Sequence, residues 1–179
     1  MQGQRELDPD SLGDHIDRLY RAAFALCGSR ADAEDLVQDT FARVLRRPRF
    51  LRNDDDIGYL LRVLRNTFIS SRRTAGRRPS TEPLPDSLDL IEDQRARTPL
   101  EHLESQALYQ TIALLPPDFR DALVAVDVVG LSYQEAARAL GVREATLTTR
   151  LHRARRRVAG ELSQEGSGDG GERGESPPG

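Results

Sequence analysis

The chain has 179 residues, enough for one or two small domains, with 37% hydrophobic and 31% charged residues. Its net charge of −3 excludes a globally basic protein, so any contact with nucleic acid has to come from local arginine patches. A single cysteine, Cys27, excludes an intramolecular disulfide. No apolar run approaches the ~20 residues that span a bilayer, and the first residues lack a secretion-signal pattern, so we expect a cytoplasmic protein without membrane insertion.

Apolar residues at helical spacing predict three helices between residues 11 and 75, which we expect to form a first domain around one core. The first helix runs from Ser11 to Gly28. The second opens at Ser29, a residue type that caps helix N-termini, and ends at Pro48. The inner stripe of the third helix comprises Ile57, Leu60, Leu61, Leu64 and Phe68.

The surface of this first domain carries charges of both signs. The second helix begins with an acidic outer side, which is either a docking patch for a basic partner or a solvated face. The loop after it contains Phe50, a large ring among charged residues, which either packs on the core or stacks on an unpaired base. The outer side of the third helix is basic, which favours single-stranded or melting DNA, and it carries Tyr59, Arg62, Arg65, Asn66, Arg72 and Arg73.

The second half of the chain predicts a linker, another helical domain and a tail. Residues 76–99 are rich in proline and acidic residues, which indicates a flexible linker with a reach of about 80 Å. Residues 100–162 predict a four-helix domain whose first helix is stopped by Pro116 and Pro117. Residues 163–179 are Gly-rich, polar and acidic, so we expect a disordered tail. The fold class is therefore all-α, with two small helical domains.

The stretch from 131 to 158 predicts a helix-turn-helix. Ser132 and Glu135 match a capping box, and Gly141 stands where the chain must leave the first helix. In such a motif the second helix lies in the major groove of DNA. The alternative is a surface hairpin with a solvated basic face. The inward stripe is Leu147, Leu151, Ala154 and Val158, and the opposite face carries Arg143, Glu144, Thr146, Thr149, Arg150, Arg153, Arg155, Arg156 and Arg157.

The order of these motifs resembles a known family. The chain contains DAEDLVQDTFARVL, then GYLLRVLRNTFISSRR, then a linker, then LPPDFRDALVAVDVVGLSYQEAARALGVREATLTTRLHRARRRV. This succession resembles the bacterial RNA polymerase sigma factors of the extracytoplasmic-function group, which keep two helical domains, called regions two and four. The resemblance covers about residues 12 to 160.

The resemblance implies binding to core RNA polymerase, recognition of the −35 and −10 promoter elements, and promoter melting. The acidic helix would dock on the coiled coil of the largest polymerase subunit through Asp32, Glu34, Asp35, Gln38 and Asp39. The polymerase flap would be a further contact of the chain. The −35 element would be recognised by the second helix of the helix-turn-helix, through Arg143, Glu144, Thr146, Thr149, Arg150 and Arg153. The resemblance leaves open whether an anti-sigma factor binds this chain.

The −10 element is assigned to the loop and helix of the first domain. By the resemblance, the loop around Phe50, Arg52 and Asn53 captures an extruded base together with Asn66. With the basic face of the third helix, the candidate −10 and melting residues are Phe50, Arg52, Asn53, Tyr59, Arg62, Asn66, Arg72 and Arg73. The chain departs from the family pattern at Tyr59, where Trp is usual, at Ser70, where Asp is usual, and at Ala145-Thr146-Leu147 instead of Gly-Thr-Val.

Three alternatives belong to other classes of protein. A dimeric helix-turn-helix transcriptional regulator explains the second domain, but it does not explain the acidic and basic helices of the first. A helical adaptor would bind only protein. An enzyme is disfavoured, because His15, His102 and His152 are scattered without metal-ligand spacing and the chain has no Gly-rich phosphate loop. We therefore expect no catalytic residue, no metal and no cofactor.

Overall fold

The protein is described by a computed structural model over residues 5–6, 9–46, 50–51, 56–75 and 99–165. Apart from two short paired strands, the described residues are helical or lie in short connections between helices. The elements in chain order are β1 (Arg5–Glu6), η1 (Pro9–His15), α1 (Ile16–Cys27), α2 (Arg30–Leu45), β2 (Phe50–Leu51), α3 (Asp56–Ala75), α4 (Pro99–Ala113), α5 (Pro117–Leu123), η2 (Val124–Val128), α6 (Tyr133–Leu140) and α7 (Glu144–Glu165).

The three predicted helices of the first domain are present, with one change at the start. The segment Pro9–His15 forms the 3-10 helix η1, and α1 begins only at Ile16, later than the predicted Ser11. The turn between α1 and α2 follows the prediction, because Gly28 adopts a left-handed conformation at φ 75°. The hydroxyl of Ser29 then accepts a hydrogen bond of 3.4 Å from the backbone N–H of Asp32.

The apolar stripe of α3 faces the core as predicted. Leu60 and Leu64 are fully buried, and Ile57, Leu61 and Phe68 expose less than a tenth of their surface. Such a continuous inward stripe explains why α3 packs on both α1 and α2. Before α3, the backbone of β2 pairs antiparallel with β1, which aligns Glu6 with Phe50.

Prolines begin two helices in the second half of the chain. Pro99, which the sequence placed in the linker, is the first residue of α4, and Pro117 is the first residue of α5. Proline suits this position, because the first residue of a helix needs no N–H partner within the helix. The rest of the predicted linker and of the predicted tail lies outside the described residues. However, α7 continues through Gly160 to Glu165, so the first three residues of the predicted tail are helical.

The sequence predicts one helix over residues 119–129 that ends at Gly130, but it does not predict that the second half of this helix is π-helical. After α5 the helix widens into the π-helix η2, and the chain then turns at Gly130, which has a φ of 80°. Short π-helical segments are rare and commonly occur at functional places in a fold. The backbone N–H of Leu131 reaches back to the carbonyl of Ala125, six residues earlier, at 3.0 Å. The sequence pattern carries no period that distinguishes this turn from an α-helical one.

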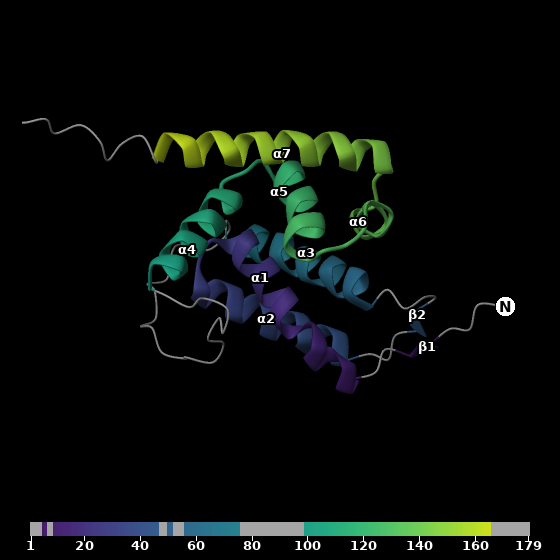
Figure 1. The fold of residues 1–179 in the computed structure, drawn as a ribbon. Helices are drawn as coiled ribbons and strands as arrows, with labels where there is room; N and C mark the ends of the chain where they lie inside the picture. The colour runs from purple at the N-terminus through teal and green to yellow at the C-terminus, as the bar shows by residue number, and fades with distance from the viewer. Residues whose placement is uncertain (1–4, 7–8, 47–49, 52–55, 76–98, 166–179) are drawn as a thin grey trace, which may run out of the picture.

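The two helical units pack directly on each other. In Figure 1, α7 forms the layer farthest from α2, and α4, α5 and α6 lie between α7 and the α1–α3 unit. Buried residues of both units form one continuous hydrophobic cluster. The rings of Phe24 on α1 and Tyr109 on α4 have centroids 5.1 Å apart. A Cβ atom at Gly28 would lie 3.1 Å from the Cβ of Ala113, so this close approach also requires glycine.

Candidate nucleic-acid interface

The helix-turn-helix formed by α6 and α7 has both the predicted N-terminal cap on α6 and the predicted glycine turn between the helices. The hydroxyl of Ser132 accepts a 3.3 Å hydrogen bond from the N–H of Glu135, whose carboxylate accepts one of 2.8 Å from the N–H of Ser132. The hydroxyl of Ser132 also donates a 2.6 Å hydrogen bond to this carboxylate, and that bond, followed by the one from the Ser132 backbone, lowers the pKa of the Glu135 carboxyl. At the other end, Gly141 adopts φ 68° and Val142 donates its N–H to the carbonyl of Ala137 at 3.0 Å. This is a complete helix-turn-helix frame.

The outer face of α7 is open to solvent. Leu147, Leu151 and Ala154 are at most 1% exposed and hold the helix on the core, as the stripe predicted. Five of the six predicted −35 residues are exposed on the remaining surface, namely Arg143, Glu144, Thr146, Thr149 and Arg153. Threonines and arginines presented together on one helix provide contacts both to base edges and to phosphates.

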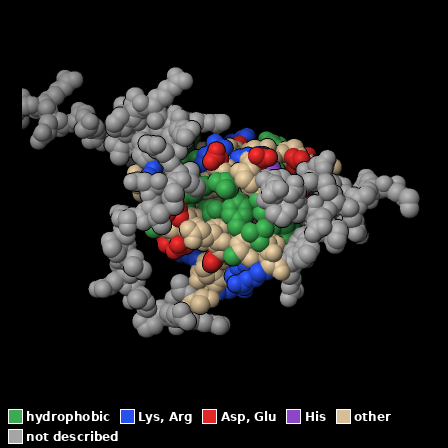
Figure 2. Space-filling view, turned by 90° about the horizontal axis from the view of Figure 1, so that it is seen from below, with side chains coloured by type: hydrophobic (Ala, Val, Ile, Leu, Met, Phe, Trp, Pro, Cys, Tyr) green, Lys and Arg blue, Asp and Glu red, His purple; other side chains and the backbone are tan. Residues whose placement is uncertain are grey.

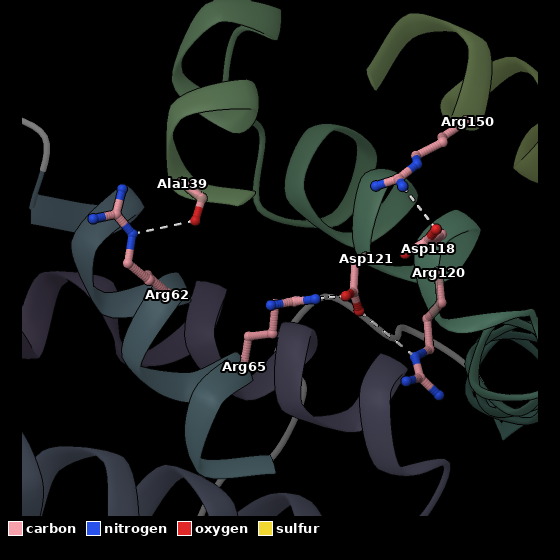
Figure 3. Close-up of polar contacts among 7 residues, drawn as sticks. All are labelled: Arg62, Arg65, Asp118, Arg120, Asp121, Ala139 and Arg150. Atoms are coloured by element: carbon pink, nitrogen blue, oxygen red, sulfur yellow. Dashed lines mark hydrogen bonds and ion pairs between the residues drawn. The ribbon is translucent and has the colours of Figure 1, made fainter. Parts of the chain in front are cut away.

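Arginines at the edges of this face are paired within the second unit. Arg150, the sixth predicted −35 residue, lies 2.7 Å from a carboxylate oxygen of Asp118 on α5 (Figure 3). Arg155 makes two hydrogen bonds to Asp127, of 2.9 and 2.7 Å, and these raise the pKa of Arg155. Surface ion pairs are worth about 0–1 kcal/mol, so a phosphate could replace either carboxylate at little cost.

The predicted −10 face on α3 differs from the α7 face because part of it contacts the second unit. Asn66, Arg72 and Arg73 are exposed, and Tyr59 is partly buried. Arg62 bonds to the second unit, since its Nε donates to the carbonyl of Ala139 at 3.2 Å and its Nη2 to that of Arg138 at 2.7 Å. Figure 3 shows the Arg62 side chain pointing from α3 to the end of α6.

The loop before α3 is described only in part. Phe50 lies in β2, where its backbone pairs with β1. Arg52 and Asn53, the other predicted base-capture residues of this loop, lie outside the described residues. The predicted meeting of these three residues with Asn66 therefore remains a prediction.

The structure reveals a cluster of charged residues between the two units, of which the sequence analysis named Arg65 but not Arg120 or Asp121. Arg65 on α3 donates a hydrogen bond to Asp121 on α5, and Arg120 lies beside the same carboxylate (Figure 3). Arg120 is 6% exposed, lies 5.0 Å from the Phe68 ring and donates a 3.2 Å hydrogen bond to the Ala113 carbonyl. Burial lowers the pKa of Arg120. The sequence signal that could have indicated Arg120 and Asp121 is that this charged pair interrupts the apolar stripe of residues 119–129.

The acidic side of α2 faces outward. Asp32, Asp35, Gln38 and Asp39 are exposed and Glu34 is half-buried, whereas the opposite side of α2 packs into the core. Figure 2, seen from the side of α1 and α2, shows an apolar area bordered by acidic and basic side chains. Leu45 on α2 is 58% exposed and Ile16 on α1 is 36% exposed. An exposed mixture of acidic and apolar groups is typical of a protein-binding surface.

Other candidate chemistry is not supported by the described residues. Burial, followed by the charge of Asp32, raises the pKa of Cys27 to about 12, as for an inert packing cysteine. Within the described ranges, no group of three or more His, Cys, Asp or Glu side chains is placed to hold a metal ion. None of the described helices is long and apolar enough to cross a membrane.

Comparisons with known proteins decide the family. The model for sigma-70 region 2 matches residues 12–78, and the model for sigma-70 region 4 matches residues 105–158. The chain belongs to the extracytoplasmic-function (ECF) group of the sigma-70 family. It is 36% identical to the ECF RNA polymerase sigma factor SigE of Mycolicibacterium smegmatis over 86% of this chain, and 33% identical to the ECF sigma factor EcfG of Rhodopseudomonas palustris over 90%.

A solved relative supports the same family and arrangement. The sigma factor RpoE of Bartonella quintana, crystallised in complex with the anti-sigma factor NepR, is 27% identical with a TM-score of 0.65. That match covers 87% of this chain and 98% of RpoE. The match with SigE spans 60% of the relative's length, and the match with EcfG spans 91%. In family terms, α1–α3 form region 2, and α4–α7 form region 4 with its helix-turn-helix.

Proposed function

We propose that this ECF sigma factor binds core RNA polymerase, recognises the −35 and −10 elements of promoters and promotes their melting. The observation that carries the proposal is the exposed Thr- and Arg-bearing face of α7 on a complete helix-turn-helix, together with a second arginine-rich helix, α3, in region 2. Region 4 binds the −35 element as duplex through α7. Region 2 binds the −10 element through α3 and the loop before it.

Melting in this scheme needs no catalytic step and no cofactor. Each base that stacks on an aromatic side chain contributes about 1–3 kcal/mol. Extruding a base costs a few kcal/mol. A few captured bases, added to duplex binding by region 4, therefore shift the equilibrium of a short promoter segment toward the open form. Phe50 and Tyr59 are the aromatic residues that we assign to this stacking.

The polymerase docks, in this proposal, on the exposed acidic side of α2. Asp35 and Asp39 are one turn apart and both exposed, which suits a basic helical partner such as the coiled coil of the largest subunit. Region 4 provides the further contact, with the flap. An anti-sigma protein is a third proposed partner, supported by the NepR complex of the Bartonella relative.

The test is in-vitro transcription with sigma-free core polymerase and a promoter library from the source genome. We expect a stable complex with core and start sites that share two upstream elements. Replacing Asp35 and Asp39 by asparagine should weaken complex formation, and replacing Arg30, at the start of the same helix, by glutamine should not. A chain that binds a palindromic duplex as a dimer and never selects a start site would favour the dimeric regulator instead.

A further inference from the structure

The loop between α2 and α3 is tied through its backbone to a strand near the beginning of the chain. This loop comprises residues 46–55, and β2 lies in its middle. β2 pairs antiparallel with β1, so that Arg5 lies opposite Leu51 and Glu6 lies opposite Phe50. Figure 1 shows the two strands beside each other at one edge of the molecule. A segment that is distant in the sequence therefore holds this loop.

β1 is connected to the core of the α1–α3 unit through η1. Leu12 of η1 is 5% exposed, and η1 packs on α1. In turn, α1 packs on both α2 and α3, the two helices that the loop connects. The loop is thus held at three places: at the end of α2, at the beginning of α3 and, through β1, at β2. Because a tie in the middle of a loop removes backbone conformations that its two ends leave free, β1 restricts this loop.

The two aromatic residues that we assign to base stacking obtain their positions in different ways. Tyr59 is on the first turn of α3 and packs partly against the core, so the helix fixes its position. Phe50 is not in a helix, and its backbone is held by the pairing with β1. An aromatic residue stacks most tightly when it is already in place, because ordering its backbone during binding costs conformational entropy. The strand pair gives Phe50 what α3 gives Tyr59.

We propose that β1 is a positioning strand for the −10 element, and that it holds the backbone at Phe50 in the conformation that receives an unpaired base. The inference rests on the proposed function of this loop. In this scheme β1 contacts no DNA and acts through β2 alone. Strand pairing is made by backbone N–H and C=O groups, so the effect depends on the backbone at Arg5 and Glu6 and not on their side chains.

A pair of double variants tests the backbone pairing. Arg5→Pro with Glu6→Pro removes both N–H groups of β1, and therefore the donor to β2 whichever of the two residue pairs is the hydrogen-bonded one. The matched control is Arg5→Ala with Glu6→Ala, which loses the same two side chains but keeps both N–H groups. Each double variant loses one positive and one negative charge, so the net charge stays at −3. A difference between the two variants therefore reports on the pairing and not on electrostatics.

Promoter opening is the quantity to measure, as the permanganate reactivity of unpaired thymines. The sample is core polymerase with the full chain on a promoter that the wild-type chain selects from the genomic library. We expect the double proline variant to lower the opening equilibrium about tenfold relative to the double alanine variant, roughly the cost of ordering one further backbone residue during binding. Binding of core polymerase and of a −35 duplex should be equal in both variants, because neither α2 nor α7 is part of the strand pair.

A double-variant cycle separates positioning of Phe50 from a merely structural role. In the double proline background, Phe50→Ala should cause little further loss of opening, because the backbone that places the ring has already been released. Tyr59→Ala is the control for this step. Its loss should multiply with that of the double proline variant, since α3 positions Tyr59 independently of β1.

Equal opening by the double proline and double alanine variants would overturn the proposal. So would a loss in the double proline variant that multiplies fully with that of Phe50→Ala. If circular dichroism shows that the double proline variant does not fold, Arg5→Gly with Glu6→Gly takes its place, because glycine weakens a strand. A wild-type chain that selects no promoter would overturn the proposed function and this inference together, whereas the first two outcomes overturn the inference alone.

Discussion

The outer faces of α7 and α3 are both rich in arginine, but among the described residues the α3 face is the one whose arginines bond across to the other region. On α7, Thr146, Thr149 and Arg153 are exposed, and within the described part of the chain the ion pairs of Arg150 and Arg155 are with Asp118 and Asp127 of region 4. On α3, Arg62 and Arg65 bond across to region 4. A basic helical face therefore does not by itself identify a free DNA surface, because backbone carbonyls and carboxylates of the same chain compete for it.

The largest expected effect tests whether the two faces share one core. Leu64 under α3 and Leu151 under α7 are 0% and 1% exposed. Replacing either with alanine should lower the free energy of unfolding by about 2–5 kcal/mol. Because buried residues of both regions form one cluster, we expect a single transition in urea denaturation followed by circular dichroism. Two transitions, of which each variant shifts only one, would show that the regions unfold independently.

The next largest expected effect distinguishes the two faces by the promoter element that each one binds. Arg153→Ala should weaken binding of a duplex carrying a −35 element by about 1–3 kcal/mol, since its exposed guanidinium is free for a base edge or phosphate. Arg62→Ala should leave this binding unchanged, because Arg62 is directed at α6. The measurement is fluorescence anisotropy of the free chain at one fixed salt concentration. Equal losses in both variants would contradict the distinction between the faces.

A smaller effect concerns the paired arginine of α7. Asp118→Asn removes the partner of Arg150 and should change the free energy of unfolding by less than about 1 kcal/mol, because Asp118 is 58% exposed. The freed guanidinium should bind a phosphate, so duplex affinity should rise and its salt dependence should steepen by about one unit of log–log slope. A salt series with wild type and variant checks this. An unchanged slope would place Arg150 away from the DNA backbone.

Local chemistry in the sequence predicted most of the secondary structure. The Ser132–Glu135 box and the glycine turns at Gly28 and Gly141 depend on residues within five positions of one another, and all three are present. The buried stripes of α3 and α7 follow in the same way from helical spacing. The π-helix between α5 and α6 was harder to predict, because a π-helix and an α-helix place the same apolar residues inward over a single turn.

The contact between the regions could not be predicted from local pattern. Arg18 on α1 donates to the carbonyl of Val129, 111 residues away, and a backbone carbonyl has no sequence signature. Arg62 likewise bonds to the carbonyls of Arg138 and Ala139 whatever their side chains are. Of the candidate site, the exposure of the α7 face and of the acidic α2 side followed from amphipathic spacing. The engagement of Arg62 required the tertiary structure.

The smallest expected effect is a pH dependence confined to α6, the helix whose N-terminus is capped by its own residues and whose C-terminus is held by α3. Hydrogen bonds from Ser132 lower the pKa of Glu135 in the folded chain. The stability that these hydrogen bonds contribute is therefore fully present above the ordinary pKa of the carboxyl. It is lost as the pH falls through the lower pKa that Glu135 has in the folded chain. Glu135 lies near the surface, so solvent screening should limit this contribution to a few tenths of a kcal/mol.

Glu135→Gln is the matched variant, because glutamine can still accept the Ser132 hydrogen bonds but does not titrate. We expect wild type to lose slightly more stability than Glu135→Gln between about pH 7 and about pH 3.5, measured as the shift of the urea midpoint. The remaining carboxylates titrate alike in both proteins and cancel in the difference. A shift as large in the variant as in wild type would mean that the box holds α6 through hydrogen-bond geometry alone.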